Sequence, residues 1–169
     1  MPSRPKSRAS GTILLLVTAL LSACTSMSTA PPPAELPRFA FVSLHGAPLR
    51  VSVFDQRAGD RDEQWARRVE SDLTKVLISA GVQILPGAER SFEVRLLRAR
   101  SDFENRQWNG CVQLSGRVVP QPLPTSTNGE ACVAKANLWG KGTADNVLRL
   151  AYEDAMVKML SAMDAQLSN

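Results

Sequence analysis

Residues 49–85 read LRVSVFDQRAGDRDEQWARRVESDLTKVLISAGVQIL and contain a complete strand–helix–strand pattern. Apolar and polar residues alternate over Leu49–Phe54 up to its last residue, which predicts a strand. Over 62–80 the apolar residues recur every three or four positions, which is the period of a helix with one buried face. Val82–Leu85 is a second, short apolar strand. This connection predicts a right-handed unit whose two strands run parallel.

Both ends of this helix are marked in the sequence. Asp60 or Asp62 can accept hydrogen bonds from the first backbone N–H groups, as N-cap residues do. Gly81 follows the last helical position and can take the left-handed conformation that ends many helices. We therefore expect the helix to pack on a sheet through one apolar stripe. The stripe comprises Trp65, Val69, Leu73, Val76, Leu77 and Ala80.

Three more strands are expected along the chain. Ser91–Arg100 alternates, and its parity shifts at Leu97, where we expect a bulge or a turn of the strand. Two cysteine-containing strands follow at 111–119 and 131–139. Residues 120–130, between them, are rich in turn residues and should form an exposed, mobile loop.

The remaining segments complete the expected fold. Arg38–Leu44 can add an edge strand, and the polar residues 102–110 predict a loop. Thr143 can cap a last helix that runs to about Leu167. The order predicts an α+β fold, with a four- to five-stranded mixed or antiparallel sheet and two helices packed on one face. The apolar face of the last helix comprises Leu148, Ala151, Tyr152, Ala155, Met159, Ala162 and Met163, widened by Val147, Leu150, Met156 and Leu160.

The first 23 residues have the layout of a secretory signal. Three basic residues without an acid precede the apolar run Ile13–Leu21, and small residues follow it. The run is shorter than the roughly 20 residues that a membrane-spanning helix needs. Without this segment the 20 Lys and Arg fall to 17, against 16 Asp and Glu. A charge balance so close to neutral argues against a nucleic-acid-binding surface.

Leu21-Ser22-Ala23-Cys24 resembles the bacterial lipobox. The resemblance implies that residues 1–23 are a lipoprotein signal peptide and that a diacylglycerol is attached to Cys24 through a thioether. The alternative is an ordinary signal peptide with a chance cysteine. In Gram-negative members of this class an Asp after the cysteine favours the inner membrane, so Thr25 implies sorting to the outer membrane.

A tether is expected after the lipidated cysteine. Residues 24–37 contain small polar residues and Pro31-Pro32-Pro33, which favour an extended chain. At about 3 Å per residue, residues 25–36 of this segment can hold the domain up to about 35 Å from the membrane. Residues 38–169 then form a single periplasmic α+β domain.

Cys111 and Cys132 are the two other cysteines, and an oxidising periplasm predicts a disulfide between them. Two buried free thiols are the alternative. Cys111 points away from the apolar face of its strand, whereas Cys132 lies among the apolar alternate residues of its own. A facing pair is therefore expected to require a bulge near Gly110 or Gly116, or a Cys111 placed just before the strand.

No catalytic constellation, metal site or cofactor is expected. His45, the only histidine, lies in a predicted turn and is interpreted as a solvated residue. Two cysteines and this histidine match no common ligand spacing. Asp102 and Glu104 can form an acid pair, but a solvated loop explains them equally well. The arginines Arg95, Arg98 and Arg100 are interpreted as solvated charge at a strand edge rather than as an anion site.

Two features are candidate contacts for a partner or a lipid. Met156, Met159 and Met163 lie on the last helix, and methionine adapts to irregular apolar surfaces such as acyl chains. Filling of the core is the alternative. Trp108 and Trp139 lie near strand ends and would be partner contacts if exposed. Covering the rim of the sheet is the alternative.

The order of lipobox, tether, sheet and helices is similar to that of YajG-type outer-membrane lipoproteins and of the accessory lipoprotein of lipopolysaccharide assembly. The resemblance implies a non-enzymatic protein held at the periplasmic face of the outer membrane by the acyl chains of Cys24. It would bind a protein partner in envelope assembly or maintenance. One alternative is a lipid or glycolipid carrier with an apolar cleft between helices and sheet. Another is a hydrolase whose cleft contains His45 or clustered acids.

Overall fold

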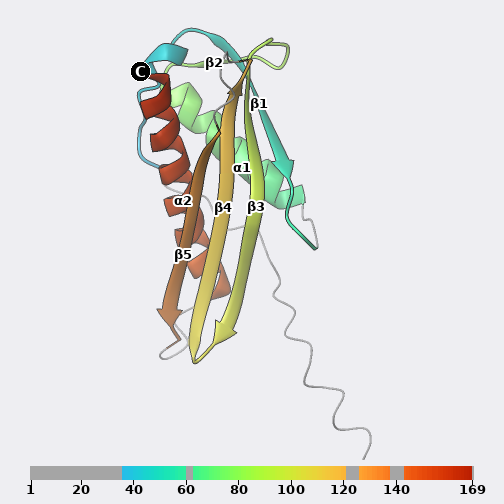
Figure 1. The fold of residues 1–169 in the computed structure, drawn as a ribbon, viewed down its shortest axis with the longest axis vertical. Helices are drawn as coiled ribbons and strands as arrows, with labels where there is room; N and C mark the ends of the chain where they lie inside the picture. The colour runs from blue at the N-terminus through green and yellow to red at the C-terminus, as the bar shows by residue number, and fades with distance from the viewer. Residues whose placement is uncertain (1–35, 60–62, 121–125, 138–142, 169) are drawn as a thin grey trace, which may run out of the picture.

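The computed structural model describes residues 36–59, 63–120, 126–137 and 143–168 of the 169-residue chain. Five strands, two α-helices and one short 3-10 helix make up these residues (Figure 1). Their bounds, in chain order, are η1 (Val42–Leu44), β1 (Pro48–Asp55), α1 (Glu63–Ser79), β2 (Gln83–Ile84), β3 (Ser91–Glu104), β4 (Gln107–Val119), β5 (Thr127–Ala136) and α2 (Ala144–Leu167).

The strands form one mixed sheet in the order β2-β1-β3-β4-β5. β1 runs parallel to both β2 and β3, whereas β3, β4 and β5 pair antiparallel. Figure 1 shows both helices behind the long strands, on the same side of the sheet. The predicted α+β class, with two helices on one face of a mixed sheet, is confirmed.

The segment from β1 to β2 follows the sequence pattern closely. The expected helix extends over Glu63–Ser79, and its stripe is buried. Gly81 ends it with a φ of 80°, in the left-handed region that glycine adopts at little cost. Pro48 pairs with Gln83 in parallel register, as predicted. The two proposed N-cap aspartates lie outside the described residues.

The polar segment 102–110 is not a loop, contrary to the sequence prediction. It forms the end of a long β3–β4 hairpin, closed by a two-residue turn at Asn105 and Arg106. Both turn residues have positive φ, 52° and 61°, as a type I′ hairpin turn requires. The expected irregularity near Leu97 is confirmed, because the β3–β4 register shifts between Leu96 and Arg98.

The predicted edge strand at 38–44 is also wrong. Phe41 and Leu44 are both fully buried, and a spacing of three suits the 3-10 helix η1 rather than a strand. Phe41 has a φ of 42°, which breaks any extended run. Its backbone N–H donates to Asp164 Oδ1 of α2 at 2.9 Å. This contact ties the amino-terminal end of the described domain to the last helix.

Glycines on the inner face of β4 and β5 let α2 lie close to the sheet. A Cβ added at Gly110 would lie 2.7 Å from the carbonyl carbon of Val147. A Cβ at Gly129 would overlap the carbonyl oxygen of Ala155. Both contacts are with the helix backbone, which cannot move aside as the end of a flexible side chain can. The distance between α2 and the sheet therefore depends on these two positions.

The two helices also contact each other through a buried polar group. The rings of Trp65 on α1 and Tyr152 on α2 meet edge to face, with centroids 5.9 Å apart. The Tyr152 hydroxyl donates to Asp72 Oδ2 at 3.2 Å, and Arg68 Nε donates to the same oxygen at 2.8 Å. Burial, and then the charge of Asp72, raise the pKa of Tyr152 well above its usual value.

The glycine contact predicts a large stability difference between two alanine substitutions. Gly129→Ala should destabilise the fold by about 1–3 kcal/mol, because the new methyl group forces α2 away from β5. Gly87→Ala is the matched control, since a Cβ there meets nothing within 4 Å. Urea denaturation of both variants measures the difference. Equal midpoints would contradict the close packing.

The buried tyrosine predicts a loss of stability in alkali. Because folding raises the pKa of Tyr152, the protonated hydroxyl stabilises the fold fully below the unfolded-state pKa of about 10. This stabilisation is lost as pH rises beyond that pKa. Tyr152→Phe should be less stable than wild type at neutral pH, by about 1 kcal/mol. This difference should narrow above pH 10. Tyr152 is the only tyrosine, so ultraviolet titration of tyrosinate reads it directly. A normal titration in the folded protein would contradict the burial.

Candidate functional site

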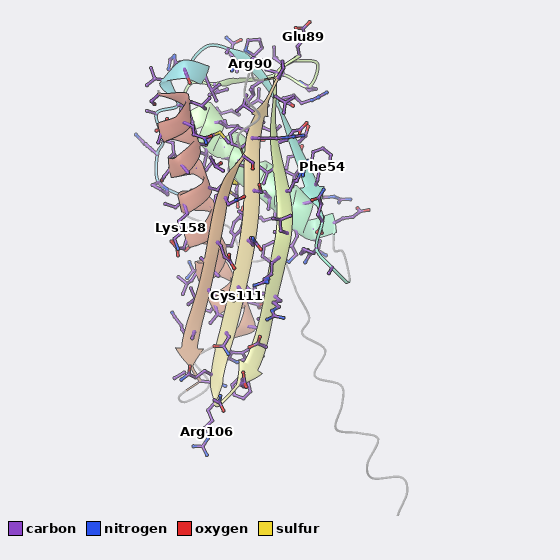
Figure 2. All side chains as sticks on the ribbon, in the orientation of Figure 1. Phe54, Glu89, Arg90, Arg106, Cys111 and Lys158 are labelled. Carbon is purple, nitrogen blue, oxygen red and sulfur yellow. A yellow bond between two sulfur atoms is a disulfide. The ribbon has the colours of Figure 1, made fainter. Side chains whose placement is uncertain are left out.

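One face of the sheet carries no helix, and none of the segments that the structure describes covers it. We call it the uncovered face. Its side chains alternate with the buried ones and form rows across neighbouring strands. Figure 2 labels two of its members, Phe54 and Cys111. The face comprises Arg50, Ser52, Phe54, Glu93, Arg95, Arg98, Arg100, Asp102, Glu104, Gln107, Asn109, Cys111, Gln113, Ser115, Arg117, Asn128, Glu130, Cys132, Ala134 and Ala136.

Arginine dominates the charge in the middle of the uncovered face, where four arginines lie with two glutamates. Arg50 adds a fifth arginine on β1, and the acids Asp102 and Glu104 lie toward the tip of the β3–β4 hairpin. Nη2 of Arg117 lies 2.7 Å from Oε2 of Glu93, and Nη1 of Arg98 lies 3.6 Å from Oε1 of Glu130. No hydrogen bond or ion pair joins the side chain of Arg95 or Arg100 to any residue in the described ranges. The middle of the face therefore presents unbalanced positive charge, which favours an acidic partner.

The interpretation of three of these arginines as strand-edge charge is wrong. β3 carries Arg95, Arg98 and Arg100, and it lies in the middle of the sheet between β1 and β4. Their guanidinium groups therefore project from the face of the sheet and not from its edge. Arg95 is half-buried, unlike the two that follow it along β3.

Cys111 and Cys132 face each other as register partners on β4 and β5, and a disulfide joins them as predicted. The bulge expected for this pairing is not needed. The inner face of β5 carries Thr127, Gly129 and Ala131, so Cys132 turns outward together with its alternate alanines. The strand also begins earlier than predicted, at Thr127. The bridge therefore links two strands from the outer side of the sheet, and the alternative of two buried thiols is wrong.

The three methionines of α2 do not form a binding surface. Met156, Met159 and Met163 are all buried, with at most 1% of each residue exposed. Met159 lies against Gly116 of β4, where a Cβ would approach its sulfur to 2.9 Å. They fill the space between α2 and the sheet, which is the alternative that the helical pattern left open.

The tip of the β3–β4 hairpin carries an aromatic pair. Trp108 is half-buried and packs against Phe103, with ring centroids 5.1 Å apart. The arrangement fits the alternative of a tryptophan that covers the rim of the sheet. Phe103 is 52% exposed, and its position within a supposed polar loop hid it from the sequence interpretation. Trp139 lies outside the described residues.

The candidate catalytic groups lie apart. His45 is exposed, and its ring lies over Gly81, just before β2. Asp102 lies near the far end of β3, where its Oδ1 accepts a hydrogen bond from Asn109 at 3.0 Å. Within the described ranges, no group of three or more His, Cys, Asp and Glu side chains is arranged to hold a metal ion.

The proposed lipid anchor lies outside the described residues, since Cys24, Thr25 and the tether up to residue 35 precede them. The described chain begins on the helix side of the sheet. Leu36 and Pro37 line a surface hollow together with Asp72 and Lys75 of α1. None of the described helices combines the length and apolar character needed to cross a bilayer.

Comparison with known proteins finds no matching family model and no matching curated protein. Solved structures do resemble it. The lipoprotein GNA1162 from Neisseria meningitidis is 13% identical, with a TM-score of 0.43, over 73% of this chain and 99% of its own. A protein from Xanthomonas campestris is 10% identical, with a TM-score of 0.44, over 85% and 95%. A PelC dodecamer from Paraburkholderia phytofirmans is 12% identical, with a TM-score of 0.43, over 75% and 94%. At these identities and scores the likeness carries no conclusion about function.

Proposed function

We propose that this chain is a lipid-anchored protein of the bacterial envelope that binds an acidic protein partner through the uncovered face of its sheet. The observation that carries the proposal is the group of four arginines in the middle of a sheet face that no described segment covers. Positive charge of this kind steers association and selects partners of opposite charge. The protein acts without catalysis, as an assembly or maintenance factor of the envelope.

The uncovered face also offers apolar contact area. Phe54 is 45% exposed and pairs in register with Arg95 of β3. An exposed aromatic ring beside an arginine is the composition that dominates binding energy at protein interfaces. β3 and β4 are 14 and 13 residues long, so the face is extended enough for a protein rather than a small molecule.

The place where the described chain begins supports binding through this face. The described chain begins at Leu36 against α1, and Phe41 is fixed to α2 through Asp164. Both contacts are on the helix side. A domain anchored from that side keeps the opposite face free for a partner.

The alternative of a lipid carrier loses its main support. It requires an apolar cleft between the helices and the sheet, lined by the methionines of α2. Met156, Met159 and Met163 instead fill that space and are buried.

Outer-membrane sorting, implied by Thr25, stays part of the proposal.

Site-specific photo-crosslinking in cells tests the proposed binding face. A photoreactive amino acid in place of Gln113, on the uncovered face, should capture one acidic protein. The same group in place of Glu70, exposed on α1, should not capture it. Arg100→Glu should abolish the adduct at Gln113, because it places negative charge on the docking face. An adduct that survives this charge reversal, or that forms equally from Glu70, would reject the proposal.

Metabolic labelling with radioactive palmitate tests the anchor separately. Wild type should carry the label and Cys24→Ala should lose it, because the thiolate of this cysteine is the acceptor of the diacylglycerol. Cys111→Ala is the matched control and should keep the label, since its sulfur is in a disulfide. Label that persists in Cys24→Ala would refute the anchor.

A further inference from the structure

A small polar hollow opens on the uncovered face between β3, β4 and the residue before β5. Its volume is about 100 Å³. Pockets that enclose a whole small-molecule ligand measure roughly 300–1,000 Å³, so this one has room for a single functional group. Its lining comprises Glu93, Arg95, Ser115, Gly116, Arg117 and Ser126.

The two arginines of the hollow differ in their hydrogen bonds. Arg117 donates from Nε and Nη2 to Oε2 of Glu93, at 2.9 and 2.7 Å. Arg95 pairs in register with Ser115, and no described residue accepts a hydrogen bond from its guanidinium. A guanidinium has five N–H donors in a fixed fork that matches a carboxylate or a phosphate. Half-buried Arg95 therefore supplies the donors for an anion.

The charge of the hollow selects the kind of anion. Arg95 and Arg117 contribute two positive charges and Glu93 one negative charge, which leaves a single positive charge. A monoanion balances it. A phosphate dianion would exceed it and would also lie close to the carboxylate of Glu93. The hydroxyls of Ser115 and Ser126 can donate further hydrogen bonds to a carboxylate oxygen.

We infer that this hollow binds one carboxylate group and that Arg95 is its principal contact. The inference rests on the proposed function for the source of the carboxylate, which is an acidic side chain of the protein partner docked on the uncovered face. A free small carboxylate is the other source of the same chemistry. Ser115 and the carboxylate-paired Arg117 orient the group beside Arg95.

Nuclear magnetic resonance titration of the processed full-length protein in detergent tests the inference. The observed signals are the Nε–H of the arginines and the backbone amides of Ser115 and Gly116. The probes are sodium acetate, capped glutamate, capped glutamine and inorganic phosphate, each against sodium chloride at constant ionic strength. Arg95→Gln should weaken carboxylate binding at least about tenfold, as loss of a charged hydrogen-bond donor does. Arg67→Gln, exposed on α1 on the helix side of the sheet, should bind as wild type does.

The expected result is saturable shifts with acetate and capped glutamate, and none with capped glutamine or chloride. Tighter binding of capped glutamate than of acetate supports the side-chain source, whereas the reverse order overturns it in favour of a free carboxylate. Phosphate that binds more tightly than the carboxylates would overturn the carboxylate site. So would an Arg95→Gln variant that binds acetate as tightly as wild type does and has the same melting temperature. Acetate binding does not require the partner protein. The acetate titration can therefore show no binding while the crosslink at Gln113 forms, and acetate can bind while no crosslink forms.

Discussion

The close approach of α2 to the inner face of β4 and β5 is the constraint on which the rest of the structure depends. Gly110 and Gly129 meet the backbone of the helix itself, so the inner face must carry small residues at these places. The remaining inner residues fill the space around them, together with the buried methionines of α2. With both helices committed to this side, the polar alternate residues of the long strands form the opposite face.

The same constraint explains which parts of the fold the sequence predicts. The helices are visible because large apolar residues recur at helical spacing, and the bulge of β3 is visible because its parity shifts at Leu97. The sequence does not show which face of β5 points inward. Thr127, Gly129, Ala131, Val133 and Lys135 alternate with Asn128, Glu130, Cys132, Ala134 and Ala136, so each set mixes polar residues with small or apolar ones. Only the position of α2 shows that Gly129 and Ala131 face inward.

Two other differences have local causes. The β3–β4 turn lacks the Asn-Gly signal, because Arg106 takes the second left-handed position that glycine usually occupies. The charged contacts of the uncovered face depend on register. Arg117 and Glu93 are 24 positions apart and meet only because β3 and β4 pair as they do. Sequence alternation alone indicates that Arg95 points outward, but not that none of the described residues accepts a hydrogen bond from its guanidinium.

In the part of the chain that the structure describes, helices cover one face of the sheet and leave the other face open. The disulfide joins β4 to β5 from the open side, and the amino-terminal end of the described chain is fixed on the closed side. This division suits a protein held at a membrane from one side and a partner bound on the other.

Hydroxyl-radical footprinting tests that division most directly, on the full chain in intact envelopes and after purification in detergent. Phe54 lies on the uncovered face, whereas Ile78 is exposed on α1. Phe54 should be oxidised in the purified protein and protected in the envelope, while Ile78 reacts equally in both. Equal oxidation of Phe54 in the two preparations, or protection of Ile78 instead, would contradict a partner docked on the uncovered face.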